Sequence, residues 1–294
     1  MKLGYSIPNN QGVAAVADLV ALAAHAETLG YHSVWVSEHL FHSTYVAKRL
    51  GARPYHDPLT VLTAIAGQTE VVRLGTSVLV IPWHHPARLG KTIASLDNLS
   101  NGRVDLGVGV AITEDEFENL GVDFKTRGRR ADDTLAALRA LWSEDVPQHD
   151  GPFYQFSGQR FEPKPMQSPL PVHIGGGSEA ALKRVVAFGH GWHALGKSPN
   201  ELGADLERLR GLLAAAGRAD DPMHVSIRCV VDFVDQPWDK PYGDRRTLKG
   251  TSAEVRATIE AYAAAGVDEI VIDANSADLP RNREIMQRVM TLMA

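Results

Sequence analysis

The sequence contains almost no cysteine: of its 294 residues, only Cys229 is one. A single cysteine excludes an intrachain disulfide, which is consistent with a reducing compartment. Cys229 lies in the apolar run of residues 225–231, where a packed thiol is far more common than a nucleophile. We therefore expect this side chain to be part of the core.

The sequence also lacks long apolar runs and any concentration of basic charge. No apolar stretch approaches the roughly 20 residues that a membrane-spanning helix needs, and a predicted strand at residues 3–8 leaves no room for a secretory signal. The formal net charge is −5 and the basic residues are scattered, so nothing favours nucleic acid or an anionic membrane. These absences predict a cytoplasmic protein that binds neither.

One unit recurs along the whole sequence: an amphipathic helix, a glycine and a short apolar strand. The glycine can end the helix in a left-handed conformation and turn the chain back toward a sheet. The predicted strands are residues 3–8, 33–37, 73–81, 103–109, 171–175, 191–195, 224–234 and 269–273. Eight strands that alternate with helices predict an α/β fold closed into a (β/α)8 TIM barrel, a single domain over residues 1–294.

Three segments are too long, or too rich in proline, for ordinary connections between a strand and a helix. They follow the second, fourth and seventh predicted strands, at residues 39–57, 148–171 and 235–250. We expect insertions at these places. The first of them is a candidate lid or pocket loop.

A run of glycines ends the predicted fifth strand: Gly175, Gly176 and Gly177, followed by Ser178. Active sites of such barrels are built at the carboxyl ends of the strands. Backbone amides at the start of a helix suit a phosphate group. The simpler interpretation is a tight turn in which Ser178 only caps the helix. Three successive glycines exceed what a cap requires, so we favour phosphate binding.

His39 follows the second predicted strand, beside Glu38. A histidine there can give or take a proton near neutral pH, but it can equally be packed under the loop that follows. The four carboxylates of residues 114–118 most often form the solvated first turn of a helix. His84 and His85 do not complete a set of metal ligands, so we predict no metal.

Four motifs follow one another through the middle of the third and fourth predicted units: residues 74–79 (LGTSVL), Pro86, residues 96–103 (LDNLSNGR) and residues 106–109 (LGVG). In order and spacing they resemble the core of the bacterial luciferase-like superfamily, above all the branch that uses the deazaflavin coenzyme F420. Further matches are residues 34–39, 57–60, 127–130, 138–142, 151–154, 171–178 and 265–268. The resemblance therefore covers nearly the whole chain.

The resemblance implies a barrel that binds a flavin or deazaflavin at its carboxyl face and moves a hydride. It places Ser77 and Val78 where such proteins often hold a non-prolyl cis peptide against the middle ring of the cofactor. Glu38 matches a residue that contacts the ring system, and His39 matches the proton donor proposed for the sugar-phosphate dehydrogenases of this branch. The other positions that it assigns to the cofactor are Val80, Val110 and Ala111 at the ring, and Gly176, Gly177, Ala180 and Ala181 at the phosphate.

Three positions depart from the pattern of that branch. Glu38 stands where aspartate is usual, Ala111 where glycine is usual, and Ile112 where the sugar-phosphate dehydrogenases have glutamate. The last departure argues against a sugar phosphate as substrate. We expect a related cofactor site that serves a different small molecule.

The residues and the resemblance together predict an F420-dependent oxidoreductase that passes a hydride between the coenzyme and a small organic substrate, with His39 as the catalytic residue. The family also implies a homodimer. Two alternatives stay open: an FMN-dependent monooxygenase of the same superfamily, since both cofactors present a tricyclic ring and a phosphate, and a non-catalytic barrel that binds F420 or flavin. A metal-dependent hydrolase is a more distant possibility.

Overall fold

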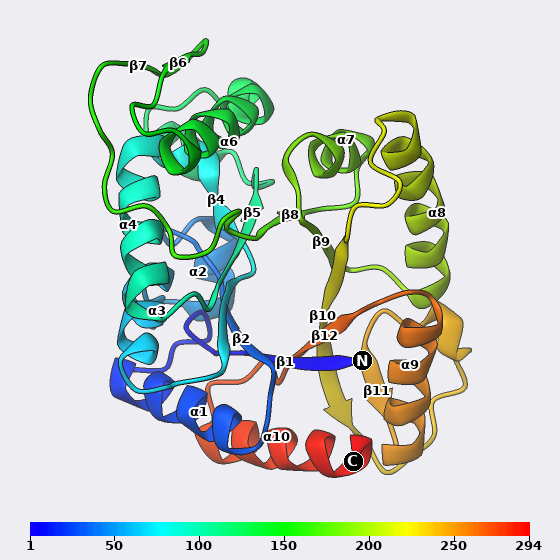
Figure 1. Ribbon diagram of the computed structural model, residues 1–294. Coiled ribbons are helices and arrows are strands. Elements are labelled where there is room, and N and C mark those ends of the chain that lie inside the picture. The colour runs from blue at the N-terminus through cyan, green and yellow to red at the C-terminus, as the bar shows by residue number, and fades with distance from the viewer.

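The computed structural model describes residues 1–294, and its centre is a closed barrel of parallel strands (Figure 1). The eight strands are β1 (Lys2–Ser6), β2 (Ser33–Val36), β3 (Arg73–Thr76), β5 (Val104–Gly109), β8 (Val172–Gly175), β9 (Gly191–Leu195), β10 (His224–Phe233) and β12 (Glu269–Asp273). Each pairs with the strands before and after it, and β1 pairs with β12, where Tyr5 lies opposite Ile272. The predicted (β/α)8 barrel is confirmed.

Helices surround the barrel and pack their apolar faces onto it (Figure 1). They are α1 (Val16–Thr28), α3 (Pro58–Ala66), α4 (Pro86–Leu99), α6 (Arg127–Ser143), α7 (Glu179–Phe188), α8 (Pro199–Ala215), α9 (Ser252–Ala264) and α10 (Leu279–Met293). In α8 the buried face contains Leu202, Leu206, Leu209 and Leu213, as the spacing predicts. Capping boxes begin both α8 and α9, because each helix follows a hydroxyl residue with a glutamate three positions later.

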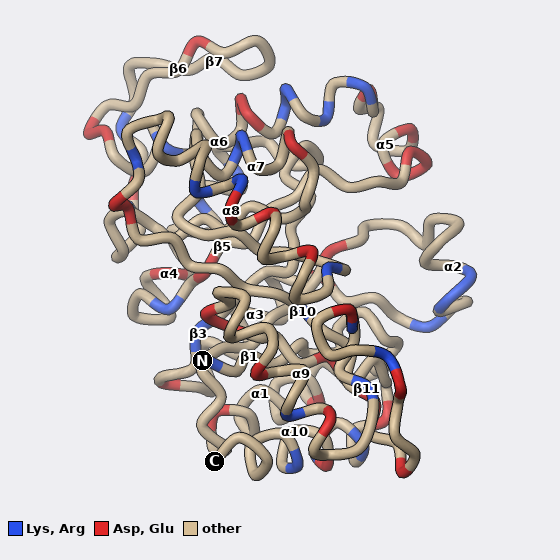
Figure 2. Tube along the Cα trace, turned by 90° about the vertical axis from the view of Figure 1, so that its right-hand side faces the viewer, with Lys and Arg blue, Asp and Glu red and all other residues tan.

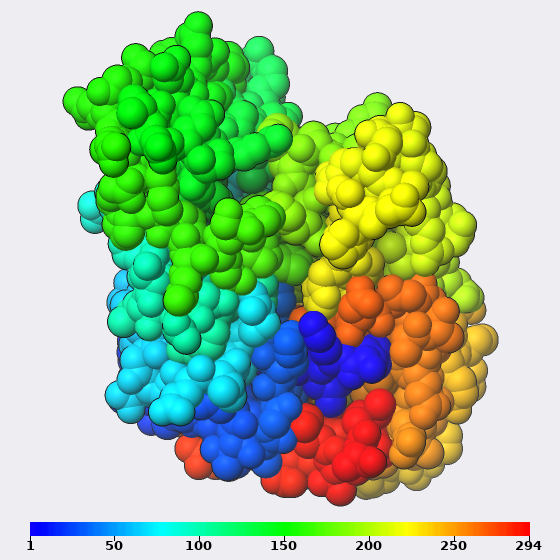
Figure 3. All heavy atoms as spheres, in the orientation of Figure 1, coloured from blue at the N-terminus to red at the C-terminus, as the bar shows by residue number.

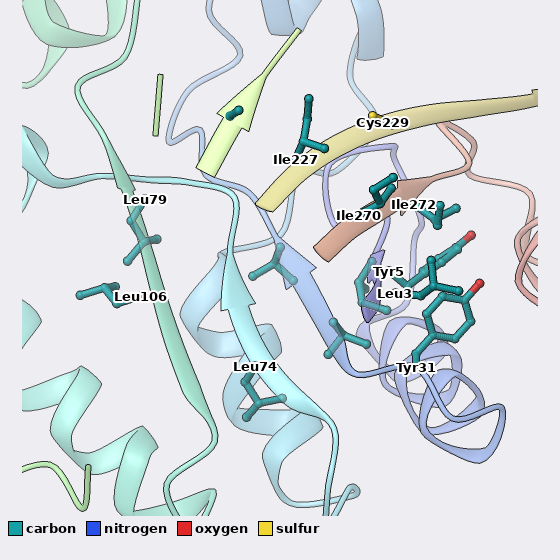
Figure 4. Close-up of a cluster of buried hydrophobic side chains, with 14 of the residues drawn as sticks. Leu3, Tyr5, Tyr31, Leu74, Leu79, Leu106, Ile227, Cys229, Ile270 and Ile272 are labelled. Carbon is teal, nitrogen blue, oxygen red and sulfur yellow. The ribbon is translucent and has the colours of Figure 1, made fainter. Parts of the chain in front are cut away.

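The core lies between the strands and these helices. Figure 4 shows part of it, where Leu3 and Tyr5 of β1 lie near Ile270 and Ile272 of β12. Cys229 is fully buried here, and burial raises the pKa of its thiol to about 12. The thiol is thus protonated and packed, as the sequence predicts.

The surface features follow the composition. Figure 2 shows acidic and basic residues interspersed along the chain. The N-terminus and α10 lie close together at one end of the molecule (Figures 1 and 3). None of the helices combines the length and the apolar character that crossing a membrane would require.

One predicted strand is wrong as a continuous element. Residues 73–81 form β3, then an interruption, then β4 (Leu79–Val80) and a 3-10 helix (Ile81–Trp83). At the interruption Thr76 donates its side-chain hydroxyl to the carbonyl of Gly107, 2.7 Å away, in place of a backbone ladder bond. Pairing with β5 resumes at Leu79 and Val108. The Ser77–Val78 peptide bond is cis, as the resemblance implied.

The three inserted segments lie outside the barrel wall. Residues 39–57 contain α2 (Thr44–Leu50), and the segment before β8 contains the hairpin of β6 (His149–Asp150) and β7 (Gln155–Phe156), which projects from the molecule in Figure 1. The third contains a 3-10 helix (Tyr242–Asp244) and β11 (Leu248–Gly250), which pairs with β10. A further short helix, α5 (Asp115–Asn119), follows β5.

Two strand glycines allow close approach inside the barrel. A Cβ atom on Gly75 would lie 2.3 Å from the indole of Trp35. On Gly107 it would lie 1.8 Å from the carbonyl oxygen of Thr76. That oxygen belongs to the backbone and cannot move aside cheaply, so the interior at this level needs glycine.

We expect Gly107→Ala to lower the free energy of unfolding by about 3 kcal/mol, the upper end of what overpacking a core costs. Gly211→Ala is the matched control, because nothing lies within 4 Å of its new Cβ on α8. It should stabilise the protein by about 0.5–1 kcal/mol. Urea titrations of both variants measure the difference, and equal effects would contradict the close packing described here.

Candidate active site

A cavity of about 780 Å³ opens at the carboxyl ends of the strands. That volume lies within the range of about 300–1,000 Å³ typical of small-molecule sites. The predicted site residues on its wall are Glu38, His39, Ser77, Val78, Val80, Val110, Ala111, Gly175 and Gly176. Four others do not line it: Gly177, Ser178, Ala180 and Ala181 continue the turn after β8 into α7. Segments that are far apart in the sequence thus meet at one cavity.

The glycine turn after β8 joins the cavity to the start of α7. Gly176 has a φ of +102°, a conformation that favours glycine. The hydroxyl of Ser178 accepts a hydrogen bond from the amide of Ala181 at 3.2 Å, so this serine is the helix cap. A Cβ on Gly177 would lie 2.7 Å from the side chain of Lys197. The turn therefore has a cation beside it, whose ammonium lies 2.8 Å from Asp205.

The floor beneath the cavity is a buried polar chain centred on His193. Its Nε2 hydrogen-bonds the hydroxyl of Ser77 and its Nδ1 that of Ser226, both at 2.8 Å. Its ring stacks on Trp35, with centroids 4.9 Å apart. Burial lowers the pKa of His193 to about 3. The ring is therefore neutral, and it hydrogen-bonds Ser77 on the side that faces the barrel interior. Sequence reasoning treated His193 only as part of a strand.

Glu38 is fully engaged within the protein. Its buried carboxylate accepts hydrogen bonds from the amide of Val80 at 2.7 Å and from Nε2 of His84 at 2.8 Å. Burial opposes the charged form of His84, but the hydrogen bond and charge of Glu38 outweigh it, so the pKa of His84 is raised. Glu38 thereby fixes the segment that follows β3. His84 was considered only as a metal ligand, and its role as the partner of Glu38 was missed.

His39 is held by a carboxylate that the sequence did not point to. Its Nδ1 lies 2.6 Å from Oε2 of Glu116, and the other oxygen of Glu116 accepts the amides of Leu40 and Phe41 at 3.0 and 3.2 Å. Burial favours the protonated form of Glu116, but these hydrogen bonds outweigh it and lower its pKa. No protein group bonds Nε2 of His39, and His39 lines the cavity.

The prediction of a solvated first turn at residues 114–118 is wrong for Glu116. Glu114 and Glu118 are exposed, but Glu116 is fully buried against the loop that follows β2. The partners are 77 positions apart in the sequence, and no local pattern reveals such a contact. Only the apolar Phe117 beside it hinted that this short helix has an inner face.

The remaining wall is polar. Arg228 of β10 binds Asp273 of β12 at 2.6 Å. Tyr55, from the insertion after β2, donates its hydroxyl to Ser37 at 3.0 Å, and burial raises the pKa of Tyr55. The cavity thus combines an apolar side near Val78 and Val110 with a side rich in hydrogen-bonding groups.

Comparisons with known proteins agree with this architecture. A family model described as luciferase-like monooxygenase matches residues 1–239. An uncharacterised protein of Mycobacterium tuberculosis is 33% identical over 225 residues, which cover 70% of this chain and 77% of the relative. An FMNH2-dependent dimethylsulfone monooxygenase of Pseudomonas putida is 28% identical over 234 residues, 74% of this chain and 62% of that protein.

Among solved structures, an F420-dependent secondary alcohol dehydrogenase in complex with an F420–acetone adduct superimposes with a TM-score of 0.84. It covers 100% of this chain and 99% of its own, at 17% sequence identity. This likeness concerns the fold.

The pair of Glu38 and His84 makes a pH-dependent contribution to stability. We expect His84→Gln to lower the free energy of unfolding by about 2 kcal/mol near pH 6, because a hydrogen bond to a buried charge is lost. Since the pKa of His84 is raised above 6.5 in the folded protein, its contribution is complete below that value and is lost as the pH rises past the folded pKa. The loss should therefore shrink near pH 9.

Urea titrations at the two pH values measure this effect. His85→Gln is the control, since the neighbouring ring is exposed and has no acidic partner. An equal loss for His84→Gln at both pH values would show that the charged pair does not form.

Proposed function

The chain belongs to the luciferase-like monooxygenase family, and we propose that it is a coenzyme F420-dependent oxidoreductase acting on a small organic substrate. The observation that carries the proposal is His39 on the wall of the cavity, held from behind by the buried carboxylate of Glu116. Moving a hydride to or from a carbonyl carbon requires a partner that manages a proton. The whole-chain likeness to an alcohol dehydrogenase that holds an F420–acetone adduct supports the same reaction class.

The residues of the cavity fit a flat ring with an anionic tail. The side chain of Val78 stands between Gly109 and Gly175, where a Cβ atom would approach it to 2.7 and 2.9 Å. These glycines let the Ser77–Val78 segment form a shelf, which Val80, Val110 and Ala111 extend. Gly175, Gly176 and Gly177, with Ser178, Ala180 and Ala181, would hold the phosphate at the start of α7. When bound, the deazaflavin would supply or accept a hydride.

His39 would hold or take the accompanying proton at Nε2. Glu116 accepts from Nδ1, so it fixes the ring orientation and the tautomer in which Nδ1 carries hydrogen. In the reducing direction the imidazolium form of His39 would donate its Nε2 proton to the carbonyl oxygen as the hydride arrives at carbon, leaving neutral imidazole. In the oxidising direction neutral Nε2 would accept the hydroxyl proton as the hydride leaves. Glu38 would not act in the proton transfer, because Val80 and His84 already occupy its carboxylate. Its role here is to hold the wall beside the ring.

A second candidate is an FMN-dependent monooxygenase. The observation that favours it is the similarity to the FMNH2-dependent monooxygenase of Pseudomonas putida. The same shelf and the same glycine turn would accept that cofactor. Direct comparison of the two cofactors separates the candidates.

We expect F420 to bind about tenfold more tightly than FMN, as measured by the change in absorbance or fluorescence of each cofactor on titration. Ala180→Glu should weaken binding about tenfold, because an exposed carboxylate at the start of α7 would repel the phosphate. Ala187→Glu places the same charge at the far end of α7 and should leave affinity unchanged. Tighter binding of FMN would favour the monooxygenase.

We expect His39→Asn to slow the reduction of small aldehydes and ketones by reduced F420 by about 10²–10⁴-fold, the usual contribution of a general acid. Glu116→Gln should cost less and should move the pH profile, because the ring keeps its place but loses its charged partner. Glu118→Gln, exposed on the same helix, is the control. Tight F420 binding without turnover of any alcohol or carbonyl compound would favour the non-catalytic barrel instead.

A further inference from the structure

Nearly every acidic or basic side chain that lines the cavity lies within 4.0 Å of an ionisable partner of the other kind. These pairs are Arg228 with Asp273, Arg246 with Glu201, Glu38 with His84, and His39 with Glu116. Arg49 is the exception. No carboxylate lies within 4.0 Å of its guanidinium nitrogens. Arg49 is therefore a cation on the cavity wall that has no carboxylate partner.

The surroundings of Arg49 hold it in place without neutralising it. It lies near the end of α2, in the insertion after β2, with its guanidinium 5.7 Å from the ring centroid of Tyr45. One terminal nitrogen donates to Oε1 of Gln11 at 3.1 Å, and the amide nitrogen of Gln11 donates in turn to Asn275 at 3.0 Å. The Nε atom of Arg49 is buried and has no hydrogen-bond partner. A buried donor without an acceptor is costly, so this atom points to a missing one.

A second unpartnered group lines the same cavity. The side chain of Asn10 is only 7% exposed, and its Oδ1 has no hydrogen-bond partner. Asn10 follows β1, and Arg49 follows β2, the strand next to it in the barrel. An orphaned acceptor and an orphaned cation thus come from adjacent connections. Neither of these two atoms has a hydrogen-bond partner in the fold.

We propose that Arg49 and Asn10 bind the substrate, and that the substrate is a small molecule with a carboxylate and a neighbouring hydroxyl or N–H group. The guanidinium would bind the carboxylate, for which its planar fork is suited. Asn10 Oδ1 would accept from the hydroxyl or N–H. This inference rests on the proposed function, since it assigns the substrate side of the same cavity.

The alternative source of an anion is the cofactor itself, but its proposed phosphate site lies elsewhere. The glycine turn follows β8, which is separated from β2 around the barrel by β3 and β5. Arg49 and His39 lie in the same inserted segment, which follows β2 and begins at His39. The charge is therefore on the side of the proton-handling pair, where the reacting molecule would sit.

The test uses three probes that differ in one group each: mandelate, its neutral amide mandelamide, and phenylacetate, which lacks the hydroxyl. Binding is measured by calorimetry or ligand-observed NMR on the protein with and without F420. Mandelate should bind about tenfold more tightly than mandelamide, as expected for a hydrogen bond to a charged group. Arg49→Gln should abolish that preference, and Arg49→Lys should retain part of it. Asn10→Ala should reduce the preference for mandelate over phenylacetate.

Lys48→Gln is the matched control, because it removes the same charge from the same helix at an exposed position outside the cavity. It should leave all three affinities unchanged. Equal binding of acid and amide, an acid preference that survives in Arg49→Gln, or no binding of either acid at millimolar concentration would overturn the proposal. Titration of F420 into wild type and into Arg49→Gln keeps the two proposals apart. If wild type does not bind F420, the cofactor assignment is refuted. The preference for the acid, measured without F420, still decides the role of Arg49.

Discussion

A carboxylate with almost no access to water is the constraint on which the wall of the cavity depends. Glu38 is 3% exposed, and a charge in that position is tolerated only if it is fully hydrogen-bonded. Its two partners, the amide of Val80 and the ring of His84, both lie in the segment that follows the interruption of β3. Satisfying one charge therefore fixes the path of the backbone that follows β3, the strand next to β2 in the barrel. The position of the shelf at Val78 depends on the path of this backbone segment.

The same device recurs wherever a loop must be held against the barrel. Glu116 binds the amides of Leu40 and Phe41, and its neighbour Asp115 binds that of Thr44 at 2.8 Å. Further examples are Glu27 with the amides of residues 70–72, Asp133 with those of Phe153 and Tyr154, and Glu254 with that of Trp238. In each case an acid on or beside a regular element accepts backbone donors that have no partner of their own. Buried carboxylates thus anchor the loops at the site, alongside buried apolar side chains such as Val46 and Phe117.

The sequence predicts the scaffold well because each helix and strand is determined by a short, continuous stretch of residues. Apolar periodicity and the glycines that end helices locate all the barrel strands. The prediction of an uninterrupted strand at residues 73–81 is wrong: backbone pairing with β5 stops after Gly75 and resumes at Leu79, and between them the side chain of Thr76 bonds Gly107. No propensity reveals such an interruption. The cis peptide bond between Ser77 and Val78 was predicted from the family resemblance and not from any local pattern. Contacts such as those of Glu116 or His84 join distant segments, so composition and spacing describe the residues but not their partners.

The pairing of β1 with β12 has a consequence for how the protein is made. Residues 2–5 lie in register with residues 269–272, so one edge of β1 stays unpaired until β12 has been synthesised. An unpaired strand edge can associate with other chains. The barrel therefore closes only after all its other strands have been made, and α10, which packs beside α1, follows the closing strand. The intermediate that precedes closure is the form in which this edge is open to other chains.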